Sequence, residues 1–307
     1  MRKGLLPRLA ALISSALLAS GAGCSIKKLA INKLGDALAE SGSSYSSDED
    51  PELIRGALPF SLKLIESLLE QSPRHQGLLT AAAGGFVQYT YAFIQQDADE
   101  IEDRDLEAAT ALRARAKKLH LRALRYALRG LDVAYPGFET ALRAEPGSAL
   151  SRTGVRDVPL LYWTAAAWGS AISLAKDDPE LLADLSLVGT ILKRALALDE
   201  SYDSGAIHDF LITYEGGRSA AMGGSEKRAR EHFERAIVLS QGKRASPCLS
   251  LAESVSIGRQ DRAEFEALLN RALAVDPDAV PEWRLANLVM QRRAKWLLGR
   301  AGELFVE

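Results

Sequence analysis

Hydrophobic residues recur at three- and four-residue intervals along most of the chain after residue 52, and short breaks rich in Pro, Gly or Asp separate these stretches. Such spacing places apolar side chains on one face of a helix, and the breaks carry residues that cap or stop helices. The pattern therefore predicts an all-α protein. The expected helices cover residues 52–71, 75–95, 104–134, 137–144, 156–176, 179–198, 204–214, 225–240, 247–259, 261–274 and 281–299.

One short pattern recurs at the ends of three of these helices, at offsets of 41 and 36 residues: Arg194-Ala-Leu-Ala-Leu-Asp199, Arg235-Ala-Ile-Val-Leu-Ser240 and Arg271-Ala-Leu-Ala-Val-Asp276. A small residue among large apolar ones is typical of the second helix of a tetratricopeptide hairpin, whose period is about 34 residues. We therefore expect a tetratricopeptide-like helical-repeat solenoid or bundle with lengthened units. Ala195, Ala236 and Ala272 should lie at helix–helix contacts. A generic helical bundle is the alternative.

Two stretches within the expected helices, 76–96 and 158–175, carry no charged side chain. A helix without a charged face lies inside a protein. Their aromatic residues suit either a core or the wall of an elongated ligand cavity between the two helices. The cavity candidates on these helices are Phe86, Tyr89, Tyr91, Phe93, Tyr162, Trp163 and Trp168. His208 and Arg293 are candidates for receiving a ligand carboxylate near the rim.

The N-terminus has the order of features found in a secretory signal. Arg2, Lys3 and Arg8 precede a short apolar stretch, and the small residues 21–23 run directly into Cys24. A cysteine at this place resembles a bacterial lipobox, although Gly21 stands where Leu is usual. We expect a signal peptide at 1–23, a lipidated N-terminus and flexible tether at 24–51, and a single helical-repeat domain at 52–307. Cys24 is the expected lipidation site, and Ser25 after it favours the outer membrane.

Charge and composition exclude several classes of function. The formal charge is −2, and removal of residues 1–23 leaves 35 Lys and Arg against 40 Asp and Glu, so no net basic field is available for nucleic acid. Cys24 and Cys248 are the only cysteines, too few for a multi-cysteine zinc site. Phosphate-loop, zincin, nucleophile-elbow and Cys-x-x-Cys motifs are missing. The sequence therefore predicts a protein that is not an enzyme, with no cofactor, no metal and no catalytic residue.

Three polar segments resemble functional motifs, but a structural interpretation is simpler for each of them. The acidic run 97–105 lacks the glycine of a calcium loop and is interpreted as an inter-helix loop that caps the next helix. The glycine-rich run 216–226 follows a helix rather than a strand, so it is interpreted as a turn with Ser225 as the next N-cap. Arg292 and Arg293, with Lys295, are interpreted as a solvated basic face.

Taken together, several segments resemble the T component associated with TRAP transporters. They include Leu161-Tyr-Trp-Thr-Ala-Ala-Ala-Trp-Gly169, Ala206-Ile-His-Asp-Phe210 and the runs 214–217, 222–240, 260–269 and 285–298. The similarity extends over residues 53–298. It implies a periplasmic lipoprotein of helical repeats that partners a TRAP solute-binding protein, carries an internal cavity or pore for a poorly soluble ligand and self-associates as a homo-oligomer.

The expected function is thus a transport-associated binding module, lipid-anchored in the bacterial cell envelope and facing the periplasm. It would hold or pass an apolar or amphipathic carboxylate. The alternative is a scaffold lipoprotein that organises envelope protein complexes without a small ligand.

Overall fold

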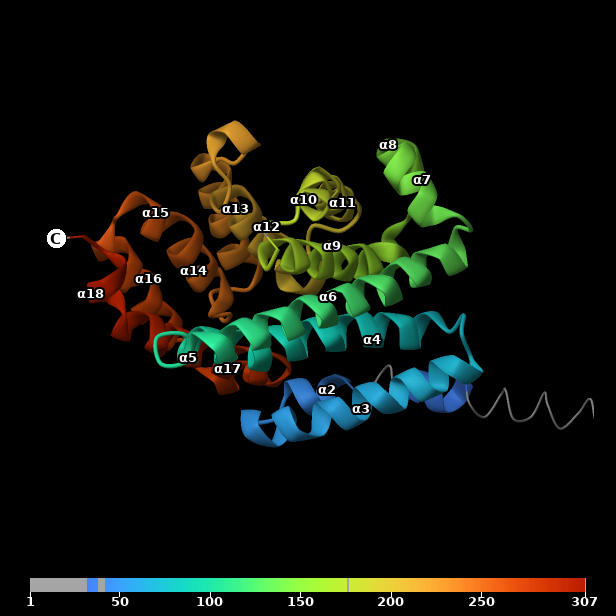
Figure 1. The fold of residues 1–307 in the computed structure, drawn as a ribbon, viewed down its shortest axis with the longest axis horizontal. Coiled ribbons are helices and arrows are strands. Elements are labelled where there is room, and N and C mark those ends of the chain that lie inside the picture. The colour runs from blue at the N-terminus through green and yellow to red at the C-terminus, as the bar shows by residue number, and fades with distance from the viewer. Residues whose placement is uncertain (1–31, 38–41, 176, 307) are drawn as a thin grey trace, which may run out of the picture.

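The computed structural model describes residues 32–37, 42–175 and 177–306. Helices and turns form all of the described secondary structure, which confirms the all-α prediction (Figure 1). The signal peptide, Cys24 and most of the expected lead at 26–38 lie outside the described residues. Residues 42–46, expected within a flexible tether, form the short helix α2 (Gly42–Ser46), and the Tyr45 hydroxyl hydrogen-bonds Ser61 at 2.5 Å.

The N-terminal half is built from long helices that pack side by side. They are α3 (Pro51–Gln71), α4 (Gln76–Tyr89), α6 (Leu106–Ala134), α9 (Val158–Ser173) and α11 (Leu185–Leu198), with α5 (Gln96–Ile101), α7 (Phe138–Ala144), α8 (Pro146–Ser151) and α10 (Pro179–Ala183) between them. Side chains start several of these helices as the sequence predicts. Asp50 accepts bonds from the first backbone N–H groups of α3, and Asp105 does so for α6. Such caps satisfy groups that the helix itself leaves unpaired.

The C-terminal half continues with shorter helices. They are α12 (Ala206–Gly216), α13 (Glu226–Leu239), α14 (Ser246–Leu251), α15 (Ile257–Arg259), α16 (Arg262–Leu273), α17 (Arg284–Gly299) and α18 (Ala301–Leu304). Ser225 caps α13, as expected from the glycine-rich turn before it. Ala195, Ala236 and Ala272 are fully buried at the ends of their helices, which confirms the prediction made from the repeated pattern.

Two large hydrophobic clusters divide the core between the halves. The first is built on α4, α6, α9 and α11, and the second on α13, α14, α16 and α17. Cys248 lies in the second cluster, where burial raises the pKa of its thiol to about 11. A thiol kept protonated in the core is unreactive, so Cys248 is a small apolar core residue.

The acidic run after α4 is helical rather than a loop. The chain passes from α4 through a π-helical segment (Thr90–Gln95) into α5, so the helix continues to Ile101. Only the short turn before Asp105 breaks it. The expectation of a loop at 97–105 is therefore wrong over residues 97–101, although Asp105 does cap the next helix.

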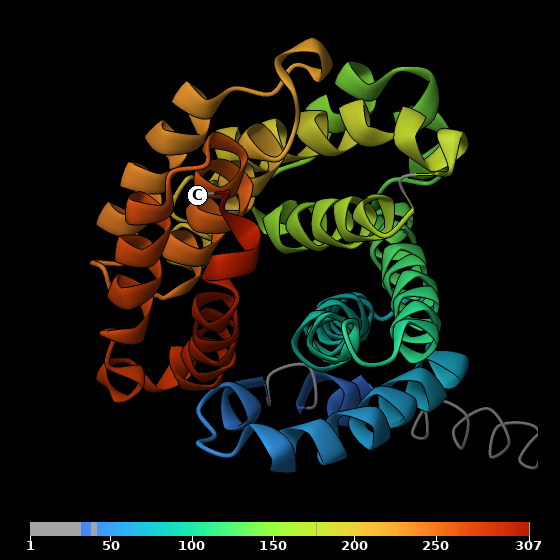
Figure 2. The same cartoon turned by 60° about the vertical axis from the view of Figure 1, so that its left-hand side comes forward.

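The chain closes on itself through an arginine clasp between α17–α18 and α5. Figure 2 shows the C-terminal helices returning beside the N-terminal ones to complete a ring. Arg292 pairs with Asp97 and Glu100 at 3.2 and 2.6 Å. The clasp also includes the pairs Arg293–Asp99 at 3.0 Å and Arg300–Asp103 at 3.4 Å. The interpretation of Arg292 and Arg293 as a solvated face is therefore wrong, because the basic run meets the acidic run.

Candidate ligand-binding interior

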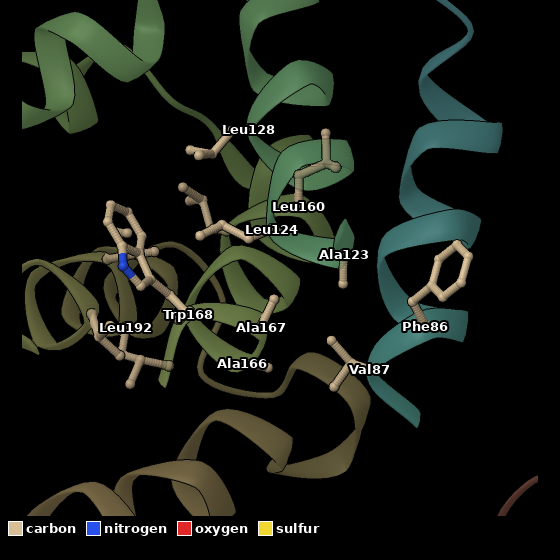
Figure 3. Close-up of a cluster of buried hydrophobic side chains, with 14 of the residues drawn as sticks. Phe86, Val87, Ala123, Leu124, Leu128, Leu160, Ala166, Ala167, Trp168 and Leu192 are labelled. Carbon is tan, nitrogen blue, oxygen red and sulfur yellow. The ribbon is translucent and has the colours of Figure 1, made fainter. Parts of the chain in front are cut away.

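Four of the seven aromatic cavity candidates pack in the hydrophobic core. They are Phe86, Tyr89, Phe93 and Trp168, with at most 8% of their surface exposed. Phe86 stacks on Tyr126 of α6 with ring centroids 6.1 Å apart, and Trp168 lies beneath the Arg143 guanidinium of α7. Figure 3 shows Trp168 among leucines of neighbouring helices, while Phe86 points away from α9. These four side chains contribute core packing.

Helices α4 and α9 contact each other directly. A Cβ atom added at Gly84 of α4 would lie 2.8 Å from the Trp163 ring, so glycine lets the helices approach closely. Val87 of α4 also points toward Ala166 of α9 (Figure 3). A cavity between these helices is therefore not found where they cross, contrary to the expectation from their lack of charge.

Tyr91 and Tyr162 behave differently from the core aromatics because both keep part of their surface accessible. Burial nevertheless raises the pKa of Tyr91 to about 12 and raises the pKa of Tyr162 well above its usual range. Removal from water disfavours a phenolate. Partly accessible surface together with strong desolvation sets Tyr91 and Tyr162 apart from the aromatic residues of the core.

Tyr91 contacts the C-terminal half, whereas Tyr162 contacts aromatic rings that precede α12 along the chain. The Tyr91 hydroxyl lies 4.0 Å from the Met290 sulfur of α17. The Tyr162 ring contacts the Trp163 ring at 4.9 Å and the Tyr202 ring at 5.4 Å between centroids. Burial also raises the pKa of Tyr202. Both tyrosines are thus desolvated by their neighbours, Tyr91 beside α17 and Tyr162 beside Tyr202.

Asp209 of α12 is a carboxyl near both tyrosines. Its charge acts on both Tyr91 and Tyr162, and its Oδ1 accepts a hydrogen bond from Ser250 Oγ of α14 at 2.6 Å. Burial raises the pKa of this carboxyl, and hydrogen bonds from Ser246 and Ser250 partly oppose the rise. Asp209 is thus a poorly solvated carboxyl that keeps some accessible surface.

Arg293 supplies the positive charge, but it is already paired. Its guanidinium binds Glu253 through bonds as short as 2.6 Å and Asp99 at 3.0 Å. Glu253 lies in a second π-helical segment (Ala252–Ser256), just as Tyr91 lies in the first. π-helical turns frequently occur at functional sites. Here Glu253 of the second segment binds Arg293, and Tyr91 of the first contacts Met290, one helical turn before Arg293.

His208 is held in a separate polar cluster. Its Nδ1 lies 2.8 Å from His232 Nδ1 of α13, and its Nε2 lies 3.2 Å from Glu200. Burial lowers the pKa of both imidazoles, which disfavours their cationic form. Neither His208 nor Arg293 is therefore a free cation for a ligand carboxylate.

We call Tyr91, Tyr162, Tyr202, Asp209 and Arg293 the interior cluster. Three of the nine cavity and rim candidates belong to it, namely Tyr91, Tyr162 and Arg293, and Trp163 packs beside Tyr162. The hydroxyl of Tyr162 makes no hydrogen bond within the described residues. The cluster thus combines aromatic surface with hydroxyl and carboxyl groups in a desolvated setting, which suits binding of a largely apolar molecule with a polar group.

Tyr202 and Asp209 were not identified from the sequence. Asp209 stands in the segment 206–210 beside His208, the residue that the sequence favours as a candidate. Successive residues on a helix point about 100° apart, so only one of these two neighbours faces the interior. The signal was present in the segment, but the residue facing the interior depends on the rotation of α12 about its axis.

Membrane-spanning helices and metal sites are both missing from residues 32–37, 42–175 and 177–306. No helix there is long and apolar enough to span a membrane. No group of three His, Cys, Asp or Glu side chains in the same ranges is arranged to hold a metal ion.

Comparison with known proteins places the chain in a family. A protein of Treponema pallidum (strain Nichols), described as an uncharacterized protein, is 31% identical over 304 residues, which cover 93% of this chain and 94% of the relative. The family model of the TRAP transporter T-component matches residues 47–305, nearly the whole described body. The resemblance seen in the sequence is thereby confirmed, and the chain belongs to the TRAP transporter T-component family.

Proposed function

We propose that this T-component is a lipid-anchored, periplasm-facing binding module that holds an apolar or amphipathic small molecule at the interior cluster. It passes the molecule to, or receives it from, the solute-binding protein of a TRAP transporter. Membership of a family of transporter components supports an envelope location and a partner within the transporter. The repeated helix ends at Ala195, Ala236 and Ala272 support lengthened tetratricopeptide-like units, which commonly serve as binding surfaces.

The state of Tyr162 is the observation that carries this proposal. Its side chain is partly accessible, strongly desolvated and without a hydrogen-bond partner for its hydroxyl in the described residues. A residue that only fills a core buries its ring, whereas Tyr162 keeps accessible surface, and its hydroxyl is not among the described polar atoms that are buried without a partner. A bound molecule that covers the ring and bonds the hydroxyl accounts for both features.

The polar group of the ligand follows from the charges around it. The charges of Asp203 and Asp209 act on Tyr162 and are opposed by Arg244, which is itself paired with Asp203 at 2.9 Å. Arg293 is neutralised by Glu253 and Asp99. A carboxylate anion would meet the like charge of Asp209 without a free cation to offset it. We therefore favour a neutral polar group, such as a hydroxyl or a protonated carboxyl, over the carboxylate that the sequence suggested.

The anchor and the partner complete the proposal. Acylation at Cys24 would hold the protein at a membrane, for which we favour the outer membrane, and multiple acyl chains give stable anchoring. The ligand is then exchanged with a TRAP solute-binding protein in the periplasm. Self-association of the chain remains part of the same proposal, since an oligomer would present several interiors to the transporter.

One observation favours the scaffold alternative. Phe86, Phe93 and Trp168 pack solidly in the core, and α4 touches α9 through Gly84. Most of the uncharged helix surface therefore serves stability, as it would in a repeat protein that binds only other proteins. The two functions differ in whether the interior cluster takes up a small molecule.

A fluorescent apolar acid or alcohol of fatty-acid length tests this point directly. Wild-type protein should bind the probe with a blue-shifted emission, and Tyr162→Phe should weaken binding by about tenfold through loss of one desolvated hydrogen bond. Tyr45→Phe, which removes a hydroxyl bonded to Ser61 on the outer layer, is the matched control. Equal binding by both variants, or no binding by the wild type, would favour the scaffold.

A further inference from the structure

Helix α6 carries a stripe of five cations along one outer face. They are Arg115, Lys118, Arg122, Arg125 and Arg129, spaced alternately by three and four residues. This spacing places them on one side of a helix. No acidic residue occurs in α6 between Glu107 and Asp132. We call these five residues the basic face; it extends over about 21 Å of helix axis.

Most of the basic face has no carboxylate to neutralise it. Arg122 pairs with the buried Glu66, and Arg129 donates hydrogen bonds to the Pro73 carbonyl at 2.6 and 2.9 Å. Arg115, Lys118 and Arg125 are exposed and form no ion pair within the described residues. Elsewhere in the chain most arginines are paired, so this concentration of free positive charge is unusual for a protein with an acidic formal charge.

The surface beside the basic face is hollowed. Lys118, Leu121, Arg122, Arg125 and Tyr126 line an open hollow of about 700 Å³ that extends to Arg129. Apolar stems and rings therefore alternate with the charged groups. Such a surface fits phosphate headgroups with some apolar contact, because basic side chains meet the phosphates while their stems stay against the protein.

The N-terminal segment of the described chain is fixed close to one end of the basic face. Asn32, the first described residue, is bonded to the α3–α4 turn through Ser72 and through His75 Nε2 at 3.2 Å. The same turn holds the end of α6, because Arg74 donates to the Val133 carbonyl at 3.2 Å. Figure 1 places this turn and the C-terminal end of α6 at the same end of the molecule.

The length of chain before Asn32 limits the distance to the membrane. Cys24 precedes Asn32 by eight residues, which span at most about 28 Å when fully extended. An acyl anchor at Cys24 therefore keeps the Arg129 end of the basic face near the bilayer. Salt screens the attraction between a basic surface and an anionic bilayer beyond about one Debye length, near 8 Å at physiological salt. A short segment between Cys24 and Asn32 keeps the basic face close enough to the bilayer to reach this distance often.

The geometry points to the basic face of α6 as a docking surface for anionic phospholipid headgroups, which orients the ring on the membrane that carries its anchor. This inference rests on the proposed acylation at Cys24 for its orientation. Docking through α6 leaves α13 and α16, on the other side of the ring in Figure 2, free for a periplasmic partner.

Vesicle co-sedimentation of the chain carrying Cys24→Ser tests the electrostatic surface without the anchor. Vesicles contain phosphatidylethanolamine with about 30 mol% phosphatidylglycerol, or phosphatidylcholine alone. The protein should bind the anionic vesicles and be released at about 0.3 M NaCl. Each basic residue contributes about fivefold to partition, so Lys118→Glu with Arg125→Glu should weaken binding at least about 25-fold.

The control variant carries Lys193→Glu with Lys295→Glu, which changes the net charge equally at exposed sites away from α6. It should bind anionic vesicles nearly as well as the parent. Equal weakening by both double variants, or no preference of the parent for anionic vesicles, would overturn the proposal. Capture of the TRAP solute-binding protein by the two double variants is measured in parallel. If the α6 variant loses this capture while its vesicle binding is unchanged, the basic face binds an acidic protein and the lipid proposal is overturned.

The anchor is tested separately by labelled palmitate. Absence of label at Cys24 would contradict the anchor while the vesicle result still reports on α6. Label at Cys24 with no anionic preference would leave the anchor standing and contradict docking through the basic face.

Discussion

We predict that Arg293 contributes more to the free energy of unfolding than the other arginines of the clasp. Its side chain is only 13% exposed and binds Glu253 and Asp99 together. Arg293→Met keeps the apolar stem and removes the charge, which leaves Glu253 without its partner, whereas Asp99 retains Arg113 at 2.9 Å. Removing one member of a buried ion pair costs about 3–5 kcal/mol.

The partial exposure of both carboxylates lowers this estimate. Glu253 is 27% exposed and Asp99 26%, so water takes up part of the lost interaction, and we expect about 2–3 kcal/mol of destabilisation. For a chain of this size the melting temperature should fall by about 4–10 °C. Arg292→Met is the matched control, because that side chain is 37% exposed and an exposed pair contributes about 0–1 kcal/mol.

Urea denaturation followed by circular dichroism measures the two free energies of unfolding, and hydrogen exchange locates the change. Exchange should accelerate in α17 and α5 before it does in α6. A double variant, Arg293→Met with Glu253→Met, should recover part of the loss, because no unpaired carboxylate remains. Arg293→Met no less stable than Arg292→Met, or faster exchange spread evenly over the chain, would refute the reasoning.

Three other predictions address the repeats, the interior and the anchor. Ala236→Leu should destabilise the protein by about 1–3 kcal/mol in denaturation experiments, because Ala236 is fully buried with its Cα 3.3 Å from a Cβ placed at Gly205; unchanged stability would mean that the contact is loose. Burial raises the pKa of Asp209 above its unfolded value near 3.8, so the free energy of unfolding falls as pH rises from the unfolded pKa to the folded one; Asp209→Asn should lessen this fall above about pH 4, and an identical pH profile would argue against a desolvated carboxyl. Cys24→Ser should abolish palmitate labelling, and persistent label would exclude Cys24 as the acylation site.

The helices were predictable because their ends depend on local chemistry. Asp50, Asp105 and Ser225 accept bonds from backbone groups only a few residues away, and such caps are visible in the sequence. The π-helical segments were not predictable, since they insert a residue into a helical turn without a distinct local signal. The direction of the Tyr91 side chain therefore differs from the one that a regular α-helix would give it.

The candidate site depends on contacts that are distant along the chain. Arg292 and Asp97 are 195 residues apart, and each run alone has the composition of a solvated segment. Only closure of the ring brings them together. For the same reason the sequence identified Tyr162 as an aromatic cavity candidate but missed Asp209, whose role depends on how α12 is rotated toward α9.

Native mass spectrometry of the gently purified protein, followed by release of any bound molecule, tests the central claim most directly. Wild-type protein should carry a small apolar or amphipathic molecule in defined stoichiometry, and a variant with Tyr162→Phe and Asp209→Asn should lose most of it while keeping the helical circular-dichroism signal. The Tyr45→Phe control should retain the molecule. A bare wild-type protein that also fails to take up added fatty acid or alcohol, or equal occupancy in the interior variant, would contradict a ligand-binding interior.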